Sequence, residues 1–529
     1  MNDTNKRKHE IIIIIVLGIA TVLSRWPFRI SVLNNHDAVN YALALDHFDM
    51  RLHQPQPPGY PLYVLVGRAF NFVFHDPLVA LTSLSTVCSG LAVVAIYLAG
   101  RDMFNRRVGL IAALILATSS AFWYQGEIAA PYTADLFASA IVGWLCYRLS
   151  TSSPANPASP LRKHKLAWLT ALAVGLAGAF RLQTFLFTFP LFLYALRQRP
   201  WKVITGAAVL AGAVFGAFLL PAIATSGGLA AFMLSMRTTV PIFWSTNTLV
   251  RSTRWSRYLK NANIIIRYTF RTLGELALPF ALAGYLSRPH RLRFWRDSKL
   301  LFFIIWIVPT WTVYLLVWPG NPGTILVCMG PPFLMAAAGL NWIINRPRWG
   351  ASVGWLCLAA ILTWNTVLFT LLPQHPWGDS YRRFNNRDTV TWIEDHFDAS
   401  LSLVREIPVE GTIIYAQAFR HLQYYLPQYR SFSLPSLRRS NPQTVRAIVS
   451  IENGIAENWN EIDVADLTPP GTERIILFDL PPELLLADPA LVQELTQDEY
   501  TLRVITIPVN YQALWTPKGL KLQKIETNE

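Results

Sequence analysis

The sequence predicts a mainly α-helical protein that crosses a membrane many times and ends in a small α/β domain. Hydrophobic residues make up 52% of the 529 residues and charged residues only 15%, whereas a soluble domain carries about 25% charge. The apolar residues gather in runs that can span a bilayer, for which a helix needs about 20 residues. Every second connector between these runs is basic, so the basic connectors fall on one side of the membrane, as the positive-inside rule requires.

We expect about eleven transmembrane helices, all within residues 1–372. The first apolar run has no small-residue cleavage site behind it, so we interpret it as a retained helix and not as a signal peptide. Arg25, at the end of this run, is expected to snorkel toward the membrane surface. The expected spans lie near residues 9–27, 77–99, 108–125, 128–148, 166–181, 183–197, 202–224, 263–286, 299–318, 323–344 and 351–372.

The positions of lysine and arginine predict the orientation. If Lys6, Arg7 and Lys8 are cytoplasmic, each later connector on the same side is also basic, which is the pattern of a multi-pass integral membrane protein. An odd number of spans then places the C-terminal region outside the cytoplasm, and in a bacterium the membrane would be the inner one. The net charge of +14 does not indicate nucleic-acid binding, because the basic residues lie between apolar runs.

Two expected outer connectors are unusually long, at about residues 28–76 and 226–262. In the first, residues 38–48 have helical spacing and are expected to lie along the interface. Residues 60–74 form either a second interfacial helix or the start of the next span. The second connector is basic, and an anionic ligand or lipid head groups would explain positive charge on the outer side. The cations that we assign to a substrate are Arg254, Arg257 and Lys260.

The composition changes near residue 372, where carboxylates become frequent and apolar runs become short. We therefore divide the chain into a transmembrane domain, residues 1–372, and an extracytoplasmic α/β domain, residues 373–529. Strands are predicted at 412–416, 474–478 and 501–508, and helices at 386–404, 442–455 and 481–496. The cysteines lie within apolar runs, so we interpret them as core residues and not as a disulfide framework or zinc site; they are Cys88, Cys146, Cys328 and Cys357.

Asp37 is the first candidate for chemistry. It lies in the first outer loop, directly before the expected interfacial helix. Spacing alone leaves two interpretations open. Either Asn34, Asn35 or Asp37 caps that helix, or Asp37 is a catalytic base at the mouth of the helix bundle. His36 beside it is a polar loop residue, a group that tunes the carboxylate, or a metal ligand.

A stiff segment follows in the same loop. Prolines fix φ within residues 57–61, and Gly59 allows a turn with positive φ. The segment is either a plain turn that re-enters the membrane or the rigid wall of a substrate site. In the second case His53 and Tyr60 would face that site.

Two further ionisable residues lie at the outer ends of predicted spans. Glu127 occupies a short outer connector, and Arg181 stands at the end of a span. An ionisable residue near bilayer depth is a candidate for function. The alternatives are a solvated loop acid for Glu127 and interfacial snorkelling for Arg181.

These residues resemble a known family. Residues 34–148 are similar to the N-terminal region of the GT-C glycosyltransferases, multi-span enzymes that use polyprenyl-phosphate sugars, and above all to the protein O-mannosyltransferase-like branch. The motifs that carry the resemblance are Asp37, His53-Gln54-Pro55-Gln56-Pro57-Pro58-Gly59-Tyr60-Pro61-Leu62, Phe122-Trp123…Glu127…Tyr132 and the late loop Asn321-Pro322-Gly323. Many relatives have two adjacent acids in the first loop. Here His36 and Ala38 flank Asp37, so the second acid would be Glu127 or be absent.

The resemblance implies an inverting membrane glycosyltransferase with a GT-C-like bundle. Its donor would be a sugar, mannose by the family's suggestion, on undecaprenyl or dolichyl phosphate. Its acceptor would be a hydroxyl of a protein, lipid or glycan, deprotonated by Asp37, with Glu127 as the second candidate catalytic residue. The residues that would bind substrate are His36, His53, Tyr60, Tyr132, Arg181, Arg254, Arg257 and Lys260.

We expect no required cofactor, because fixed cations can stabilise the leaving phosphate in place of a metal. The spacing of His36, Asp37, His53 and Glu127 supports no specific divalent metal site. Two other classes of protein remain open. A transporter or flippase of lipid-linked sugars would be expected to show repeated halves, which we do not find. A non-catalytic protein of cell-envelope assembly would tolerate the change of Asp37 to Asn.

Overall fold

The computed structural model describes most of the chain, and its helices and strands form two compact units. One unit contains residues 1–30 and 57–390, and the other contains residues 31–56 and 391–529. The predicted first outer loop, residues 28–76, is therefore divided, because residues 31–56 share a unit with the C-terminal region. The described residues are 3–152, 160–236, 255–286, 298–317, 319–372, 386–416, 419–433, 444–449, 460–463, 468, 471–478, 491–497, 500–516 and 519–524.

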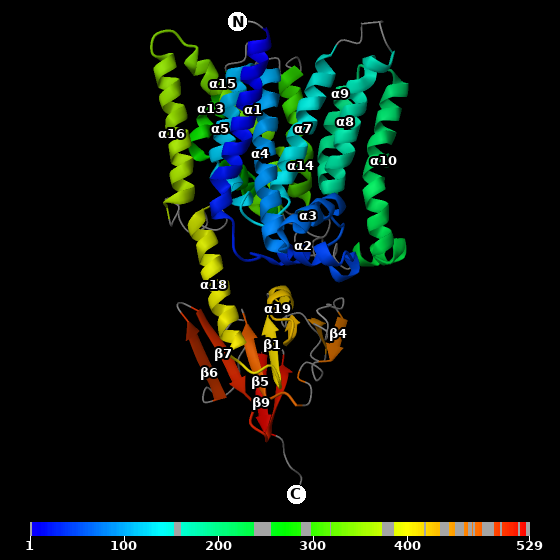
Figure 1. Ribbon diagram of the computed structural model, residues 1–529, viewed down its shortest axis with the longest axis vertical. Helices are drawn as coiled ribbons and strands as arrows, with labels where there is room; N and C mark the ends of the chain where they lie inside the picture. Colours follow the sequence, from blue (N-terminus) through cyan, green and yellow to red (C-terminus); the bar gives the residue numbers. More distant parts are fainter. Residues whose placement is uncertain are drawn as a thin grey trace. The chain divides into compact units, whose positions relative to one another are not determined.

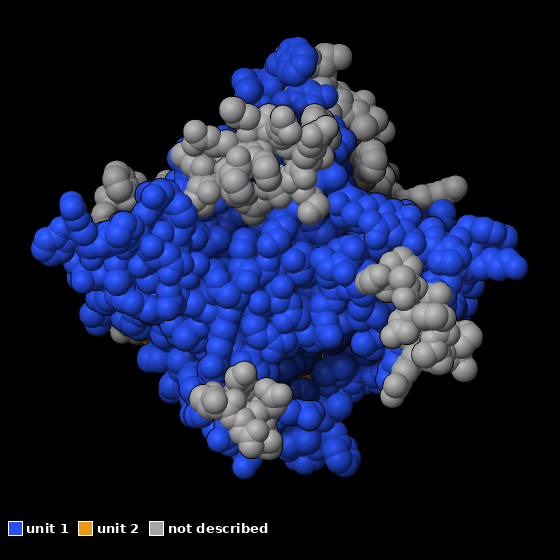
Figure 2. All heavy atoms as spheres, turned by 90° about the horizontal axis from the view of Figure 1, so that it is seen from above, with its two compact units in different colours: residues 1–30, 57–390 blue, residues 31–56, 391–529 orange. Residues whose placement is uncertain are grey.

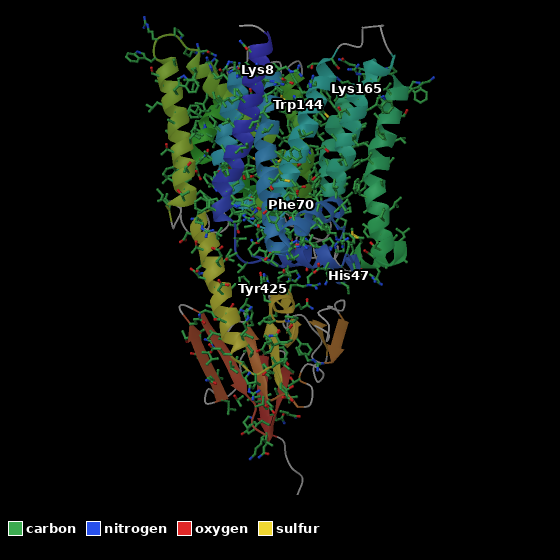
Figure 3. All side chains as sticks on the ribbon, in the orientation of Figure 1. Lys8, His47, Phe70, Trp144, Lys165 and Tyr425 are labelled. Atoms are coloured by element: carbon green, nitrogen blue, oxygen red, sulfur yellow. The ribbon has the colours of Figure 1, made fainter. Side chains whose placement is uncertain are left out.

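The first unit is helical, and its long helices lie side by side (Figure 1). Lys8 and Lys165 lie at one end of these helices, and Phe70 lies toward the other end (Figure 3). Figure 2 shows one face of this unit in a view along the helices. Its helices are α1 (Asp3–Arg25), η1 (Trp26–Phe28), α3 (Pro61–Phe74), α4 (Pro77–Met103), α5 (Arg106–Thr118), α6 (Ser120–Gln125), α7 (Tyr132–Thr151), α8 (Pro160–Phe180), α9 (Leu182–Leu196), α10 (Trp201–Thr225), α12 (Trp255–Leu273), η3 (Glu275–Ala277), α13 (Leu278–Leu286), α14 (Ser298–Leu316), η5 (Pro322–Cys328), α15 (Gly330–Ile344) and α16 (Gly350–Thr370).

Several of these helices can cross a membrane, so the chain is a multi-pass integral membrane protein. Within the described part, five helices are long and apolar enough, and a sixth span results if η5 and α15 are counted together across their 67° bend. The five are Arg7–Phe28, Pro77–Met103, Trp201–Thr225, Lys299–Leu316 and Gly350–Thr370. The expected span at 128–148 contains the continuous helix α7 of 20 residues, and the other expected spans contain shorter or interrupted helices.

Three expected spans are broken, and the structure explains why one break requires glycine. The predicted span at 263–286 is interrupted at Gly274, which has φ 86°. A Cβ atom at this position would lie 2.7 Å from Oδ1 of Asn365. Because an L side chain rarely adopts this φ and has no space here, glycine is required and α12 ends at Leu273. The other two breaks are at Ser119 and Met329.

Close helix packing in this unit also depends on glycine. Helices α13 and α15 approach each other where Gly284 faces Gly339, and a Cβ atom at Gly339 would lie 1.9 Å from the carbonyl oxygen of Phe280. Small residues at such crossings let backbones approach closely, which is the usual basis of helix association in membranes. Helix α3 is separate from α4, because Asp76 caps α4 through the N–H of Val79 at 2.9 Å.

The second unit contains a mixed sheet with helices packed on it. Its strands follow the order β4-β3-β2-β1-β5-β7-β6, with β1 parallel to both β2 and β5 and the other pairs antiparallel. Strand β1 is a buried run of Thr-Ile-Ile-Tyr-Ala, as is expected of a strand between parallel neighbours. The elements are α2 (His36–Asp46), η2 (Met50–Leu52), α18 (Arg387–Arg405), β1 (Thr412–Ala416), α19 (Phe419–Tyr425), β2 (Arg430–Ser433), β3 (Thr444–Val449), β4 (Asn460–Asp463), β5 (Arg474–Phe478), β6 (Val492–Gln497), β7 (Tyr500–Thr506) and the hairpin β8 (Tyr511–Thr516) and β9 (Gly519–Lys524).

The core of this unit lies between the sheet and the helices α18 and α19. It includes Val404 of α18, Leu422 of α19, and Ile414, Ile476 and Val504 of the sheet. This packing fixes α19 against the strands. The position of α19 therefore follows from the fold of the whole unit and not from its own seven residues.

Two predicted helices, at 442–455 and 481–496, are wrong in the part that the structure describes. Residues 444–449 form the strand β3, because β-branched Thr444, Val445, Ile448 and Val449 favour a strand over a helix. Residues 492–497 form the edge strand β6, which pairs with β7 along its whole length. The predicted strands at 412–416, 474–478 and 501–508 and the helix at 386–404 are confirmed within one or two residues. Residues 479–490 lie outside the described part of the chain.

Three of the four cysteines are buried, and Cys357 is half-buried. All four are free thiols. The interpretation as small core residues is confirmed for Cys88, Cys146 and Cys328.

Candidate active site

Asp37 lies in the first turn of α2 and is exposed. The residue that caps this helix is Asn35, whose side-chain Oδ1 accepts a hydrogen bond from the backbone N–H of Ala38 at 2.9 Å. Of the candidates for the cap, the structure therefore selects Asn35.

The two histidines assigned to the substrate lie in the same unit as Asp37. His36 is the first residue of α2, and His53 follows η2 in the left-handed region, with φ 57°. Both are partly buried. Burial, followed by the charge of Arg420, lowers the pKa of His36 to about 3 and that of His53 to about 4. Both imidazoles are therefore neutral at physiological pH, and each can accept a hydrogen bond as well as donate one.

Arg420 was not among the residues that the sequence singled out. It lies on α19, is only 2% exposed, and donates from Nη2 to the carbonyl oxygen of Leu52 at 2.7 Å. Burial lowers its pKa to about 10, so the guanidinium stays charged near neutral pH. The sequence contained no signal for the burial of Arg420, because one arginine in a helix of seven residues is usually exposed at the surface.

The loop between α2 and α3 is closed by its own hydrogen bonds. The backbone of Asp49 pairs in both directions with that of Gln54, at 2.7 Å and 3.0 Å. The buried carboxylate of Asp49 also accepts from the N–H of Arg51 at 2.9 Å, which caps η2. The peptide bonds before Pro55 and Pro58 are cis. Gly59 has φ 86°, the positive φ that the sequence predicts for a turn at this position.

A buried ion pair stands in the helical unit. Nη1 of Arg181 lies 2.6 Å from Oδ2 of Asp135, and the hydroxyl of Thr184 donates to Oδ1 of Asp135 at 2.9 Å. Arg181 is 7% exposed and Asp135 is 1% exposed. The interpretation of Arg181 as a snorkelling residue is therefore wrong. Sequence reasoning missed Asp135, although an acid inside a predicted span is itself a signal.

Tyr132 connects this pair to the late loop of the family pattern. The guanidinium of Arg181 lies 5.4 Å from the centre of the Tyr132 ring. The Tyr132 hydroxyl accepts a hydrogen bond from Nδ2 of Asn321 at 2.6 Å. Gly323 packs directly against the ring, where a Cβ atom would lie 2.3 Å from it. Two motifs that are almost 190 residues apart thus meet at one place in the helical unit.

Glu127 is fully buried in the connector between α6 and α7. Its charge interacts with that of Arg25, which is also 0% exposed. The Arg25 guanidinium donates to the carbonyl of Ala117 at 2.8 Å and lies 5.1 Å from the ring of Trp123. Both the solvated-acid interpretation of Glu127 and the expected snorkelling of Arg25 are wrong, because both side chains are fully buried.

The remaining predicted residues are distributed as follows. Tyr60 precedes α3 and is 7% exposed. Arg257 and Lys260 lie on α12, where Arg257 is half-buried and Lys260 is exposed. Arg254 lies outside the described residues. Asp37, His36 and His53 thus share one compact unit, and Tyr60, Glu127, Tyr132, Arg181, Arg257 and Lys260 share the other.

Within the described residues, no group of three or more His, Cys, Asp or Glu side chains is arranged to hold a metal ion. Arg181 and Asp135 pair with each other, and Arg25 and Arg420 each donate to a backbone carbonyl. The chemistry that they can support is acid–base chemistry and the binding of anions.

The fold and these residues define a class: a membrane enzyme with a helical bundle and a small mixed-sheet domain. Residues 47–205 match the family model described as Protein O-mannosyl-transferase TMEM260 N-terminal domain. The crystal structure of ArnT from Cupriavidus metallidurans bound to undecaprenyl phosphate has the same fold, with a TM-score of 0.54 at 13% identity, over 94% of this chain and 97% of that chain. These findings confirm the resemblance to GT-C glycosyltransferases of the protein O-mannosyltransferase-like branch, and with it the assignment as a glycosyltransferase.

Two further structures have a similar fold. The apo state of the same ArnT matches with a TM-score of 0.54 at 12% identity, over 95% of this chain and 98% of that one. The Archaeoglobus fulgidus oligosaccharyltransferase in complex with Zn and sulfate matches with a TM-score of 0.50 at 13% identity, over 87% of this chain and 67% of that one. No curated protein matches this chain with significance.

Proposed function

We propose that the protein transfers a sugar from a polyprenyl-phosphate donor to an acceptor hydroxyl, with Asp37 as the general base. The observation that supports this role most directly is the exposed carboxylate in the first turn of α2, at a position where Asn35 already provides the cap. An acid that is not needed for the helix cap and that remains open to solvent can reach an acceptor.

The donor class follows from the similar proteins. The ArnT structure contains undecaprenyl phosphate, and the family match is described as a protein O-mannosyl-transferase. We propose that this chain uses a sugar on the same kind of lipid phosphate, with mannose as the first sugar to test. The acceptor would be a hydroxyl of a protein, a lipid or a glycan.

The reaction is a single displacement. Asp37 removes the proton of the acceptor hydroxyl while its oxygen attacks the anomeric carbon of the sugar. The bond from that carbon to the phosphate oxygen breaks on the opposite face, so the configuration inverts and the lipid phosphate leaves with the bonding electron pair. The products are the glycosylated acceptor, the free lipid phosphate and protonated Asp37, which then releases its proton to water.

Cations would stabilise the leaving phosphate. The Nε atom of Arg181 is buried and has no hydrogen-bond partner among the residues described, so it retains one donor after the pairing with Asp135. We propose that this donor contacts the lipid phosphate, with Tyr132 beside it and with Arg254, Arg257 and Lys260 contributing positive charge. Removing one donor that is aimed at developing charge typically costs about 100-fold or more in rate.

Glu127 is the second candidate acid. Its burial beside Arg25 supports a role in the shape and charge of the site more than direct contact with bulk water. Tyr60, His36 and His53 would contact the sugar or the acceptor. As neutral imidazoles, the histidines would both donate and accept hydrogen bonds.

The orientation is part of the proposal. We propose about eleven spans, with the N-terminus in the cytoplasm and residues 373–529 outside it. The location of Lys8 and Lys165 at one end of the helices supports this arrangement (Figure 3), because lysine gathers on the cytoplasmic side. A reporter fused after Asn385 tests it, and a cytoplasmic signal from that fusion would contradict it.

The proposed reaction is tested with purified full-length protein in lipid nanodiscs and a panel of radiolabelled polyprenyl-phosphate sugars. Membrane extracts from cells that lack the protein supply the acceptors. We expect label to move from one donor to an acceptor, with free polyprenyl phosphate released in equal amount. The anomeric configuration of the product must be the opposite of the donor's, and retention would contradict the single displacement.

A further inference from the structure

The backbone of the loop that carries Asp37 is bound by side chains of the C-terminal region. Four of its backbone groups between residues 31 and 52 form hydrogen bonds with four side chains between residues 394 and 425, all within one compact unit. The bonds are Ser31 N to Glu394 Oε1 at 2.7 Å, Leu33 N to Tyr425 Oη at 2.9 Å, Leu33 O to His421 Nε2 at 2.7 Å, and Leu52 O to Arg420 Nη2 at 2.7 Å.

These bonds lie on both sides of α2. Leu33 is held through both its N–H and its carbonyl, two residues before the cap Asn35, and Leu52 is held after the helix has ended. His421 and Tyr425 stand one helical turn apart on α19, so their side chains point from the same face toward Leu33. Because the bonds go to the backbone, they fix the path of the chain and therefore the start of α2.

The side chains that form these bonds are themselves held in place. His421 is 3% exposed and its ring stacks on that of Phe397 at 4.6 Å. Arg420 is 2% exposed and also donates to Oε1 of Gln423 at 3.1 Å. Buried hydrogen bonds to a charged donor are stronger than exposed ones and are costly to leave unmade. The support is thus preorganised and is part of the packed core around α19.

The placement of a catalytic carboxylate is sensitive to such support. A displacement of about 1 Å can cost roughly 100-fold in rate. Asp37 lies only four residues after Leu33, and between them the chain turns into α2 at Asn35. A shift of the Leu33 backbone would move the first turn of α2, and the carboxylate with it.

We propose that Arg420, His421 and Tyr425 of α19 are positioning residues for Asp37, so that the C-terminal domain sets the geometry of acceptor deprotonation. This inference rests on the proposed role of Asp37. It assigns to the C-terminal domain a part in the chemical step that is separate from any binding of the acceptor. The three side chains act through the loop backbone and not through contact with the substrate.

The test compares kcat and KM of variants of the full-length protein in nanodiscs, with the donor that the wild type uses. Tyr425→Phe removes the hydroxyl that accepts the hydrogen bond from the N–H of Leu33 and keeps the ring. Tyr424→Phe is the matched control on the neighbouring residue. We expect Tyr425→Phe to lower kcat by roughly tenfold, with KM for the lipid donor within about twofold of wild type. Tyr424→Phe should leave both parameters unchanged.

A rescue separates positioning from general stability. His421→Ala removes the bond to Leu33 O, whereas His421→Gln offers an amide N–H near the position of Nε2. We expect kcat to fall in His421→Ala and to recover at least in part in His421→Gln, with both variants compared at the same fraction of folded protein. If His421→Ala does not fold, the Tyr425→Phe and Tyr424→Phe pair still decides the question.

The outcomes for the two proposals differ. If Asp37→Asn is inactive while Tyr425→Phe and His421→Ala transfer at the wild-type kcat, the positioning role is wrong and the proposed function stands. If Asp37→Asn transfers as well as wild type, the proposed base is wrong, and the positioning role that rests on it is wrong as well. A loss of kcat in Tyr424→Phe equal to that in Tyr425→Phe would also overturn the positioning role.

Discussion

Removing one partner of the buried pair between Arg181 and Asp135 should destabilise the protein strongly. Asp135→Ala would leave a guanidinium that is 7% exposed without its carboxylate at 2.6 Å. Breaking a buried pair in this way costs about 3–5 kcal/mol in the free energy of unfolding. Thr184→Val removes only the bond of 2.9 Å to Asp135, and a single hydrogen bond contributes about 1 kcal/mol.

The measurement is thermal unfolding of the purified variants in one detergent, read as Tm. We expect Asp135→Ala to lower Tm clearly more than Thr184→Val does. The double variant Asp135→Leu with Arg181→Met should recover much of the loss, because replacing both charges by apolar groups is often close to neutral. A wild-type Tm for Asp135→Ala, or a double variant as unstable as the sum of its parts, would refute the reasoning.

Three further predictions concern stability. Because the folded pKa values of His36 and His53 lie near 3 and 4, below the unfolded value of about 6.5, the unfolded state binds more protons between these limits. The free energy of unfolding should therefore have its full value above about pH 6.5 and decline as the pH falls toward 4, by at most about 1.4 kcal/mol per pH unit for each histidine. In the variant with both residues changed to Gln, the free energy of unfolding should depend less on pH. Gly339→Ala places a Cβ atom 1.9 Å from the oxygen of Phe280 and should lower Tm, whereas Gly212→Ala, which meets nothing within 4 Å, should not. Asn35→Ala should cost about 1 kcal/mol through loss of the cap, and Asn35→Asp should restore it in the same unfolding experiment.

The helical part of the fold could be predicted because a bilayer imposes strong rules on sequence. Long apolar runs and basic connectors mark helices that must satisfy their own backbone groups. The interruptions were harder to predict. The break at Gly274 requires glycine because Asn365, more than 90 residues later, occupies the space that a side chain would need, and this contact has no trace in the local pattern.

The strands whose side chains are buried were predicted from the sequence, and the exposed strand whose conformation depends on pairing with its neighbour was not. The central strands β1 and β5 are continuous apolar runs, so their limits could be read from the sequence. The edge strand β6 is largely exposed and carries polar residues at helical spacing. Its conformation follows from pairing with β7, which is a tertiary effect that overrides local propensity.

The candidate site shows the same limit. Asp37, Glu127 and Arg181 attracted notice because ionisable residues are rare near a bilayer. Arg420 and His421 did not, because each forms a hydrogen bond with a residue that is distant in the chain. Arg420 bonds Leu52, 368 residues away, and His421 bonds Leu33, 388 residues away. Asp135 could have been paired with Arg181 by the rule that charges inside a membrane occur in pairs.

The central claim is that Asp37 is the base for sugar transfer, and the rate of transfer by Asp37→Asn tests it most directly. The matched control is Asp46→Asn, which changes an exposed acid at the other end of the same helix. With equal Tm for all three proteins, we expect transfer to fall by about 100-fold or more in Asp37→Asn and to stay at the wild-type rate in Asp46→Asn. A wild-type rate for Asp37→Asn would contradict the claim and would make Glu127 the next candidate for the base.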